Sequence, residues 1–270
     1  MKITGSAGHG LHTPGKRCPD DSMREFMFNV AVFNYFKKEI EQYIDSKGEK
    51  VSVIGVHDPT GKKDIPLSTR SNNVNKHEPD LHIDFHANAH GSGLQWTDAN
   101  GVETFVYKKT LKDAVKVATS VQIAIVDVTG LRDRGVKEDN LHMLRETNPT
   151  SILVEGPFMS NRKEAELLKS DSFRRKFALA IVDGIAEAYN LKKNSKKTNE
   201  KEGIRMYKPS NDDMLESTIK VMKRLEDKKV HGDKALSSVH REKLGKGELP
   251  LDDAIAILFV AHDRGLIVGK

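Results

Sequence analysis

The segment LHIDFHANAH, residues 81–90, decides which fold the sequence predicts. Its three histidines, His82, His86 and His90, recur every fourth residue, and on a helix this spacing would align three imidazoles on one face. The apolar residues, however, alternate strictly along the first seven positions, which is the period of a β-strand. A strand places His82 and His86 on one face and leaves His90 beyond its end. The segment therefore predicts a strand that carries a histidine near its carboxyl end.

Strand-like and helix-like patterns alternate along the first 190 residues. The strand-like segments are Lys2–Ala7, Val51–His57, Leu81–Ala87, Val102–Tyr107 and Ser151–Gly156. The helix-like segments are Ser22–Ser46, Leu111–Val128 and Asp171–Asn190. This alternation predicts an α/β fold with a mostly parallel, twisted sheet flanked by helices. Ligands in such sheets bind at the carboxyl ends of the strands.

Charge and composition divide the rest of the chain. Residues 1–190 are balanced, with 26 Lys/Arg against 26 Asp/Glu, whereas residues 191–206 hold six basic against two acidic residues and few apolar ones. We therefore expect a basic linker at 191–206. A solvated connection is the favoured interpretation of its charge, and weak attraction to an anionic polymer is the alternative. Helical patterns after Ser210, at 235–244 and at 252–263 predict a small all-helical C-terminal module, residues 207–270.

Composition narrows the functional classes. The chain is 37% hydrophobic and 31% charged, and its longest apolar run, residues 254–261, is too short to insert into a membrane. The first ten residues, MKITGSAGHG, lack the apolar centre of a signal peptide, so we expect synthesis in the cytoplasm. A single cysteine, Cys18, excludes an internal disulfide. No nucleic-acid binding is expected, because the basic residues do not gather on a folded segment.

Three further residues could carry chemistry beside His86. His9 lies in a glycine-rich turn, SAGHG, where a lone histidine is usually a surface residue. Glu25 follows Ser22 at the spacing of a helix capping box, which would by itself explain the carboxylate. Glu155 ends the apolar run SILVE, where a carboxylate is costly unless it is ion-paired, bound to metal or used in a reaction.

These four residues together have the composition of a zinc hydrolase site. Such sites take three protein ligands from histidine and glutamate and leave a fourth position for water. His9, Glu25 and His86 would be the ligands, and Glu155 would be the general base. The intervals between them are long and variable, so the spacing alone does not require this site.

Seven short motifs, in order, give the chain a family resemblance. They are GHG (8–10), REF (24–26), DIPLSTRSNNVNK (64–76), HANA (86–89), GVETFVY (101–107), RGVK (134–137) and VEGPFMSN (154–161). Through them the chain resembles the zinc-dependent N-acetylmuramoyl-L-alanine amidases of the amidase-3 type. Two positions depart from that family's pattern: Ser6 stands where Asp is common, and Asp84 stands where Ser is frequent. Asp84 could support a metal ligand or pair with a neighbouring cation.

The resemblance implies a reaction and a set of residue roles. Zn²⁺ would be the cofactor, peptidoglycan the partner, and the bond cleaved would be the amide between N-acetylmuramic acid and the L-alanine of the stem peptide. His9, Glu25 and His86 would bind the metal and Glu155 would move protons. Arg134 and Arg145 are candidates for binding the carboxylates of the peptide, although an ordinary surface role is favoured for both. Five other histidines, His12, His57, His82, His90 and His142, and also Cys18, are expected to lie outside the metal site.

The resemblance also suggests a biological setting. A catalytic domain at 1–190 with a basic linker and a small C-terminal module looks like a phage endolysin acting on a Gram-positive wall after release. The module would then bind the wall or an anionic wall polymer. One alternative is a zinc carboxypeptidase or another metallo-amidohydrolase with the same residues. The others are a nucleic-acid binder and an inactive wall-binding protein; the charge distribution argues against the first, and Glu155 against the second.

Overall fold

The structure is a computed structural model that describes residues 1–194 continuously. Beyond them it describes only residues 216, 219, 222, 229–230, 233–234, 242–244, 246 and 249. The chain forms two compact units, Met1–Asn194 and Ser195–Lys270. None of the described helices is both long enough and apolar enough to cross a membrane.

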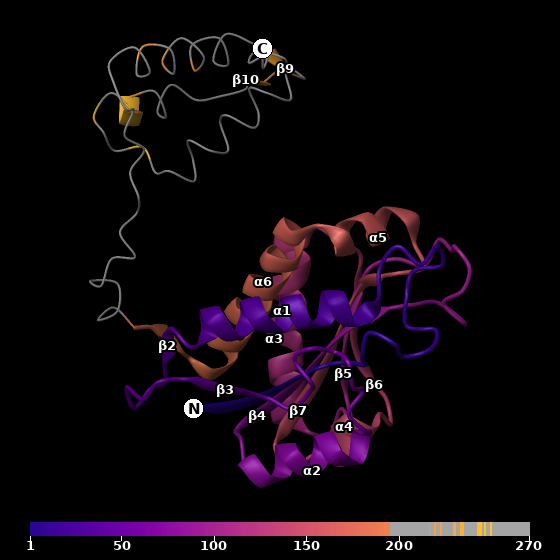
Figure 1. The fold of residues 1–270 in the computed structure, drawn as a ribbon. Helices are drawn as coiled ribbons and strands as arrows, with labels where there is room; N and C mark the ends of the chain where they lie inside the picture. The colour runs from indigo at the N-terminus through magenta and orange to yellow at the C-terminus, as the bar shows by residue number, and fades with distance from the viewer. Residues whose placement is uncertain are drawn as a thin grey trace. The chain divides into compact units, whose positions relative to one another are not determined.

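A six-stranded sheet forms the centre of the first unit (Figure 1). In spatial order its strands are β3 (Ser52–Gly55), β1 (Lys2–Ala7), β4 (Leu81–Asn88), β7 (Thr150–Phe158), β5 (Val102–Val106) and β6 (Asp133–Glu138). Neighbouring strands are parallel except for β5 and β7, which are antiparallel. The predicted α/β fold with a mostly parallel sheet is confirmed.

Strand β4 is buried on both faces, so its alternating sequence does not separate a buried face from an exposed one. Phe85 packs against Phe33 and Phe36 of the first helix, with ring centroids 6.0 and 5.3 Å away. On the opposite face, His82 and Asp84 are equally buried and contact each other. The alternation therefore separates an apolar buried face from a polar buried face, which a central strand of a parallel sheet can have.

Helices cover both faces of the sheet (Figure 1). On one side lie α1 (Glu25–Ile40), α3 (Lys112–Thr129) and α6 (Asp171–Tyr189), with α5 (Arg162–Lys169) beyond the end of β7. On the other side lie α2 (Leu67–His77) and the short α4 (His142–Arg145). Helix α6 packs closely on α3 at Gly184, where a Cβ would lie 2.5 Å from the Cα of Val121. A glycine is needed there because any side chain would separate the helices.

The start of α1 corrects one interpretation of Glu25. The helix begins at Glu25, its N-cap is Arg24, and no side chain caps it. The backbone N–H of Ser22 instead donates to Asp20. The capping box predicted from Ser22 and Glu25 is therefore wrong, because the N-cap lies two residues later than the pattern indicated. The carboxylate of Glu25 is left to make other contacts.

The region after residue 190 differs from the sequence-based expectations in two places. Strand β8 (Lys192–Lys193) pairs with β2 (Tyr43–Ile44), so the first unit continues to Asn194, inside the range expected to be a linker. Within the second unit, β9 (Lys229–Val230) and β10 (Asp233–Lys234) form an antiparallel pair. The prediction of an entirely helical module is wrong at this pair, where two short polar segments gave no periodic signal. The helix predicted at 252–263 and most of the expected linker lie outside the described residues.

Candidate metal centre

The predicted site residues meet at the carboxyl ends of the three central parallel strands. His9 follows β1 by two residues, and His86 lies near the end of β4. Glu155 lies on β7, paired in register with His86. Parallel strands end at the same edge of a sheet, so the three segments bring their side chains together there.

Glu25 lies between the two histidines. Its Oε1 is 2.9 Å from Nδ1 of His86, and its Oε2 is 3.4 Å from Nε2 of His9. The two imidazole rings are nearly perpendicular, with centroids 5.0 Å apart. One donor atom from each of the three residues lies within 4.8 Å of the others, and among the described residues Cys18 is not part of this group. Two imidazoles and one carboxylate at this spacing can hold a divalent metal ion.

The turn that carries His9 has an unusual backbone. His9 has φ +63°, in the left-handed region that residues with a Cβ seldom adopt. The residue before it, Gly8, touches the other histidine: a Cβ at this position would lie 2.1 Å from Cε1 of His86. The turn therefore places both imidazoles side by side only because residue 8 has no side chain.

Asn29 is a site residue that the sequence analysis missed. It lies one helical turn after Glu25 and donates from Nδ2 to Oε1 of Glu25 (3.2 Å) and to the carbonyl oxygen of Gly8 (3.1 Å). The backbone N–H of Ala87 donates to the same Glu25 oxygen at 3.3 Å. These contacts connect helix α1, the His9 turn and strand β4. The available signal was the four-residue spacing from Glu25 on a helix.

The charges of the cluster favour an ionised Glu25. Burial alone would raise the pKa of Glu25, but the hydrogen bond and charge of His86, together with His9, lower it to about 2. Burial would likewise lower the pKa of His86, but the same contact with Glu25 raises it to about 9. Burial lowers the pKa of His9 to about 4. A metal ion would therefore compete with a proton mainly at His86.

Glu155 is a buried carboxyl group with an unused oxygen. Its Oε2 is buried and has no hydrogen-bond partner among the described residues. Burial raises the pKa of Glu155 to about 7, with Glu25 and Glu103 adding to the effect and His86 opposing it. A buried oxygen without a partner is costly, and such groups concentrate where chemistry occurs. The group can therefore gain or lose a proton near neutral pH.

The two predicted substrate-binding arginines lie in different surroundings. Arg134 donates from Nε to Oε2 of Glu103 at 2.8 Å, and its guanidinium lies 4.9 Å from the ring centroid of Phe158. Glu103 also pairs with Lys137, and it lies opposite Glu155 in the antiparallel ladder. Arg145 instead bonds to Asn140 and Glu146 near its own short helix. Arg134 is thus connected to the strand neighbour of Glu155, whereas the contacts of Arg145 within the described part of the chain are local.

The five histidines expected to lie outside the metal site do not belong to the donor group. His82 is buried, with Nδ1 3.0 Å from Oγ1 of Thr4 and Nε2 3.3 Å from Oδ2 of Asp84. Asp84 thus pairs with a neighbouring imidazole, one of the two alternatives expected for it. His57 accepts the backbone N–H of Ala7 at Nδ1. His12 and His90 are exposed, and Nε2 of His142 is 3.1 Å from Oγ of Ser71.

A hollow of about 340 Å³ lies beside the cluster. His9 and His86 line one part of it, and Arg70, Met143 and the segment 64–67 line another. It offers space for a substrate group next to the converging donors.

Comparison with known proteins gives a consistent result. A family model described as N-acetylmuramoyl-L-alanine amidase matches residues 5–187. The chain is 32% identical over 195 residues to the N-acetylmuramoyl-L-alanine amidase CwlM of Bacillus licheniformis, covering 72% of this chain and 71% of that one. It is also 32% identical over 196 residues to the endolysin of Bacillus phage SPP1, covering 70% and 66%. The solved N-acetylmuramoyl-L-alanine amidase of Clostridium difficile 630 superposes with a TM-score of 0.62 at 26% identity, covering 70% of this chain and 96% of that chain.

Proposed function

Since this chain belongs to the N-acetylmuramoyl-L-alanine amidase family, and so cleaves the bond between N-acetylmuramic acid and L-alanine in peptidoglycan, we propose that His9, Glu25 and His86 hold Zn²⁺ and that Glu155 is the general base. The observation that carries the proposal is the buried, unpartnered Oε2 of Glu155 beside three converging donors. Two imidazoles and one carboxylate suit zinc, and a fourth position would remain for water.

The chain's own residues then have separate tasks. Zn²⁺ bound at such a site supplies Lewis-acid chemistry, which polarises a carbonyl group and makes water more acidic. Glu155 accepts a proton from water and delivers it to the departing amine of L-alanine. In the metal-free protein, burial raises the pKa of Glu155 to about 7, and a nearby divalent cation would lower it from there and favour the ionised, proton-accepting form. Glu25 and the two histidines fix the position of the metal relative to Glu155.

We further infer that Arg134 binds a carboxylate of the stem peptide. Its hydrogen bond to Glu103, which is the strand neighbour of Glu155, supports this role. The same role for Arg145 stays a prediction with less support, because its contacts are local.

For the setting, we propose an endolysin with a catalytic domain at 1–194, a linker and a wall-binding segment at 207–270. The similarity to the endolysin of phage SPP1 supports this setting. Cosedimentation of residues 207–270 with purified walls, with and without anionic polymers, would test the role of that segment.

End-group analysis of digested peptidoglycan tests the site. We expect new N-terminal alanine without new reducing sugar ends, and we expect Glu155→Gln to be slower by about 10²–10⁴-fold while still binding Zn²⁺. Glu166→Gln is the matched control, because Glu166 is exposed on α5 and pairs only with Lys169 among the described residues. The control is expected to retain full activity.

Other products would assign the site differently. Release of free C-terminal amino acids would indicate a carboxypeptidase with the same residues. Full activity of Glu155→Gln, or full activity after complete removal of metal by a chelator, would contradict the proposed roles.

A further inference from the structure

We propose that Arg70 is a positioning residue for His9 and thereby sets the affinity of the site for its metal, an inference that rests on the proposed metal site. Arg70 lies on helix α2, opposite the cluster from Glu25, and is 2% exposed. It does not belong to the donor group itself. Its contacts with the His9 turn carry the argument.

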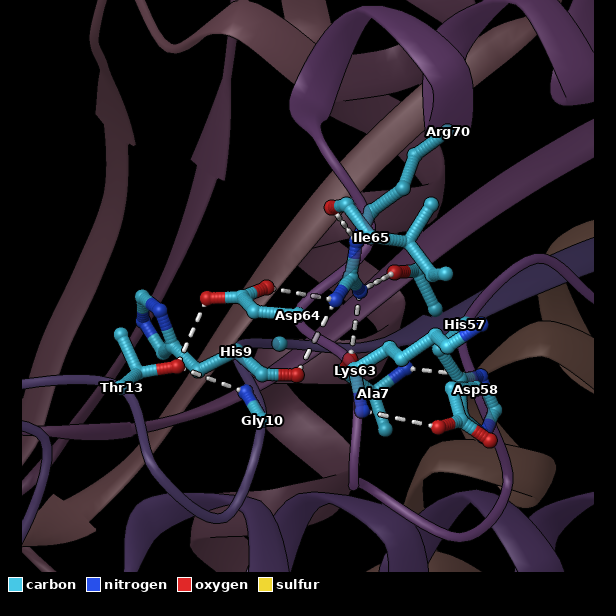
Figure 2. A network of polar contacts seen from close by, with 12 residues as sticks. Ala7, His9, Gly10, Thr13, His57, Asp58, Lys63, Asp64, Ile65 and Arg70 are labelled. Carbon is cyan, nitrogen blue, oxygen red and sulfur yellow. Dashed lines mark hydrogen bonds and ion pairs between the residues drawn. The ribbon is translucent and has the colours of Figure 1, made fainter.

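All five N–H groups of the Arg70 guanidinium have an acceptor (Figure 2). Nε donates to the carbonyl of Ile65 at 2.9 Å, and Nη1 donates to Oγ of Ser6 and to the carbonyl of Ala7, both at 2.6 Å. Nη2 donates to the carbonyl of His9 at 3.0 Å and to Oδ1 of Asp64 at 3.1 Å. A lysine could not replace this fork, because an ammonium group has three donors and no fixed plane.

A second set of contacts closes a ring around the peptide after His9. The hydroxyl group of Thr13 donates to Oδ2 of Asp64 at 2.6 Å (Figure 2). The same hydroxyl oxygen, Oγ1 of Thr13, accepts the backbone N–H of Gly10 at 2.9 Å. The carbonyl of the His9–Gly10 peptide is thus bound by Arg70 and its N–H by Thr13. Because Asp64 joins Thr13 to Arg70, the ring fixes the orientation of this peptide plane.

The peptide before His9 is bound as well, since the carbonyl oxygen of Gly8 accepts from Asn29. With both neighbouring peptide planes bound, φ and ψ of His9 have little freedom. A left-handed φ of +63° is unfavourable for histidine and persists only where surrounding contacts impose it. We infer that the ring imposes it here, and that the direction of the imidazole toward Glu25 follows from it.

The consequence is measurable as metal affinity. Without the ring, His9 can relax to an ordinary backbone conformation, and its Nε2 would leave the position 3.4 Å from Glu25. Residues that orient a metal ligand typically change affinity by about 10–100-fold when they are removed. The ring should act on the metal-free protein too, because it exists before metal binds.

The test measures Zn²⁺ affinity by chelator competition in the full chain, for the wild type, Arg70→Lys and Asp64→Ala. The unfolding temperature of each metal-free protein and the NMR resonances of the His9 ring are recorded alongside. Asp58→Ala is the matched control. Asp58 is an aspartate of the same loop whose hydrogen bonds go to Thr60 and Lys63.

We expect Arg70→Lys to weaken Zn²⁺ binding by about 10–100-fold and to shift the His9 resonances. Asp64→Ala should weaken binding by about 3- to 10-fold, since it removes two of the ring's hydrogen bonds. Asp58→Ala should leave both readouts unchanged even if it lowers the unfolding temperature. The side chain of Asp64 is 43% exposed, so Asp64→Ala should fold even if Arg70→Lys does not. In that case the comparison of Asp64→Ala with the wild type tests the proposal.

Two outcomes are distinct failures. Wild-type affinity, within twofold, and unshifted His9 resonances in both variants would overturn the role of Arg70. Absence of Zn²⁺ binding by the wild type would instead overturn the proposed metal site, and the His9 resonances of the metal-free variants would still decide whether the ring positions His9.

Discussion

Strand β4 carries two imidazoles that each contact a carboxylate, yet among the described residues only one of these pairs belongs to the candidate metal site. His82 is fully buried, and Asp84 and Thr4 occupy both of its ring nitrogens. His86 has a side chain 16% exposed, contacts Glu25 and lies beside a second imidazole. Neither ring nitrogen of His82 is free to bind a metal, and among the described residues this pair is not part of a group of three converging donors. An imidazole–carboxylate contact therefore becomes a candidate metal site only where a third donor converges and solvent can reach.

Removing His86 should give the largest effect. His86→Ala deletes one of the three converging donors, so we expect loss of stoichiometric Zn²⁺ and a fall in kcat/KM of at least about 10³-fold. Metal analysis and end-group release measure both. His90→Ala, an exposed histidine four residues along, serves as the control and should behave as the wild type.

Removing His82 should act on stability instead. His82→Ala leaves the buried carboxylate of Asp84 without its imidazole, and breaking a buried pair costs about 3 kcal/mol. Zn²⁺ affinity per folded molecule should be unchanged, which chemical denaturation and chelator competition can separate. The double variant His82→Ala/Asp84→Ala should recover part of the lost stability. If His82→Ala instead lost Zn²⁺ binding and kept normal stability, the pair His82–Asp84 would also take part in metal binding, as proposed for His86 and Glu25.

Gly8→Ala tests how closely the turn that carries His9 approaches His86, the proposed ligand on β4. The added Cβ would lie 2.1 Å from the ring of His86, so the imidazole must move, and we expect Zn²⁺ affinity to fall by about 10-fold or more. Gly15→Ala is the comparison, because a Cβ there meets nothing within 4 Å. That variant should lose only about 1 kcal/mol of stability, from its φ of +73°. Equal Zn²⁺ affinities in the two variants would contradict the packing argument.

His57 should give the smallest effect, as a dependence of stability on pH. Burial, together with the nearby Arg70, lowers the pKa of His57 to about 4 from an ordinary 6.5. The unfolded chain then binds more protons between these values, so stability is complete above pH 6.5 and falls by about 1.4 kcal/mol for each pH unit below it, down to about pH 4. Denaturation of the metal-free protein at several pH values measures this slope.

The control for that slope is His57→Asn, whose amide oxygen can still accept the N–H of Ala7. Because His9 also has a lowered pKa, the useful quantity is the difference in slope between the wild type and this variant. A difference of zero would show that folding does not lower the pKa of His57.

Local sequence patterns predicted the elements with strong periodicity. Strand β1 matches its predicted bounds, and α6, which has a long apolar pattern, differs by one residue. Strand β6, with the polar sequence DRGVKE at the edge of the sheet, was not predicted because it shows no alternation. The antiparallel pairing of β5 with β7 was also missed, because strand direction depends on how the chain returns and not on either segment alone.

The sequence by itself determined the fold class, the family and the residue types of the candidate site. Histidine and glutamate at strand ends are local features that one segment can show. The tertiary structure alone decided that Glu25 lies between two imidazoles and does not cap a helix. It also decided that the side chain of His86 is partly exposed while that of His82 is fully buried. The hydrogen bond from Arg70 to Ser6, 64 residues away, is a third such outcome. Those outcomes depend on contacts between distant segments, and no local pattern records which side chains will meet when the chain is folded.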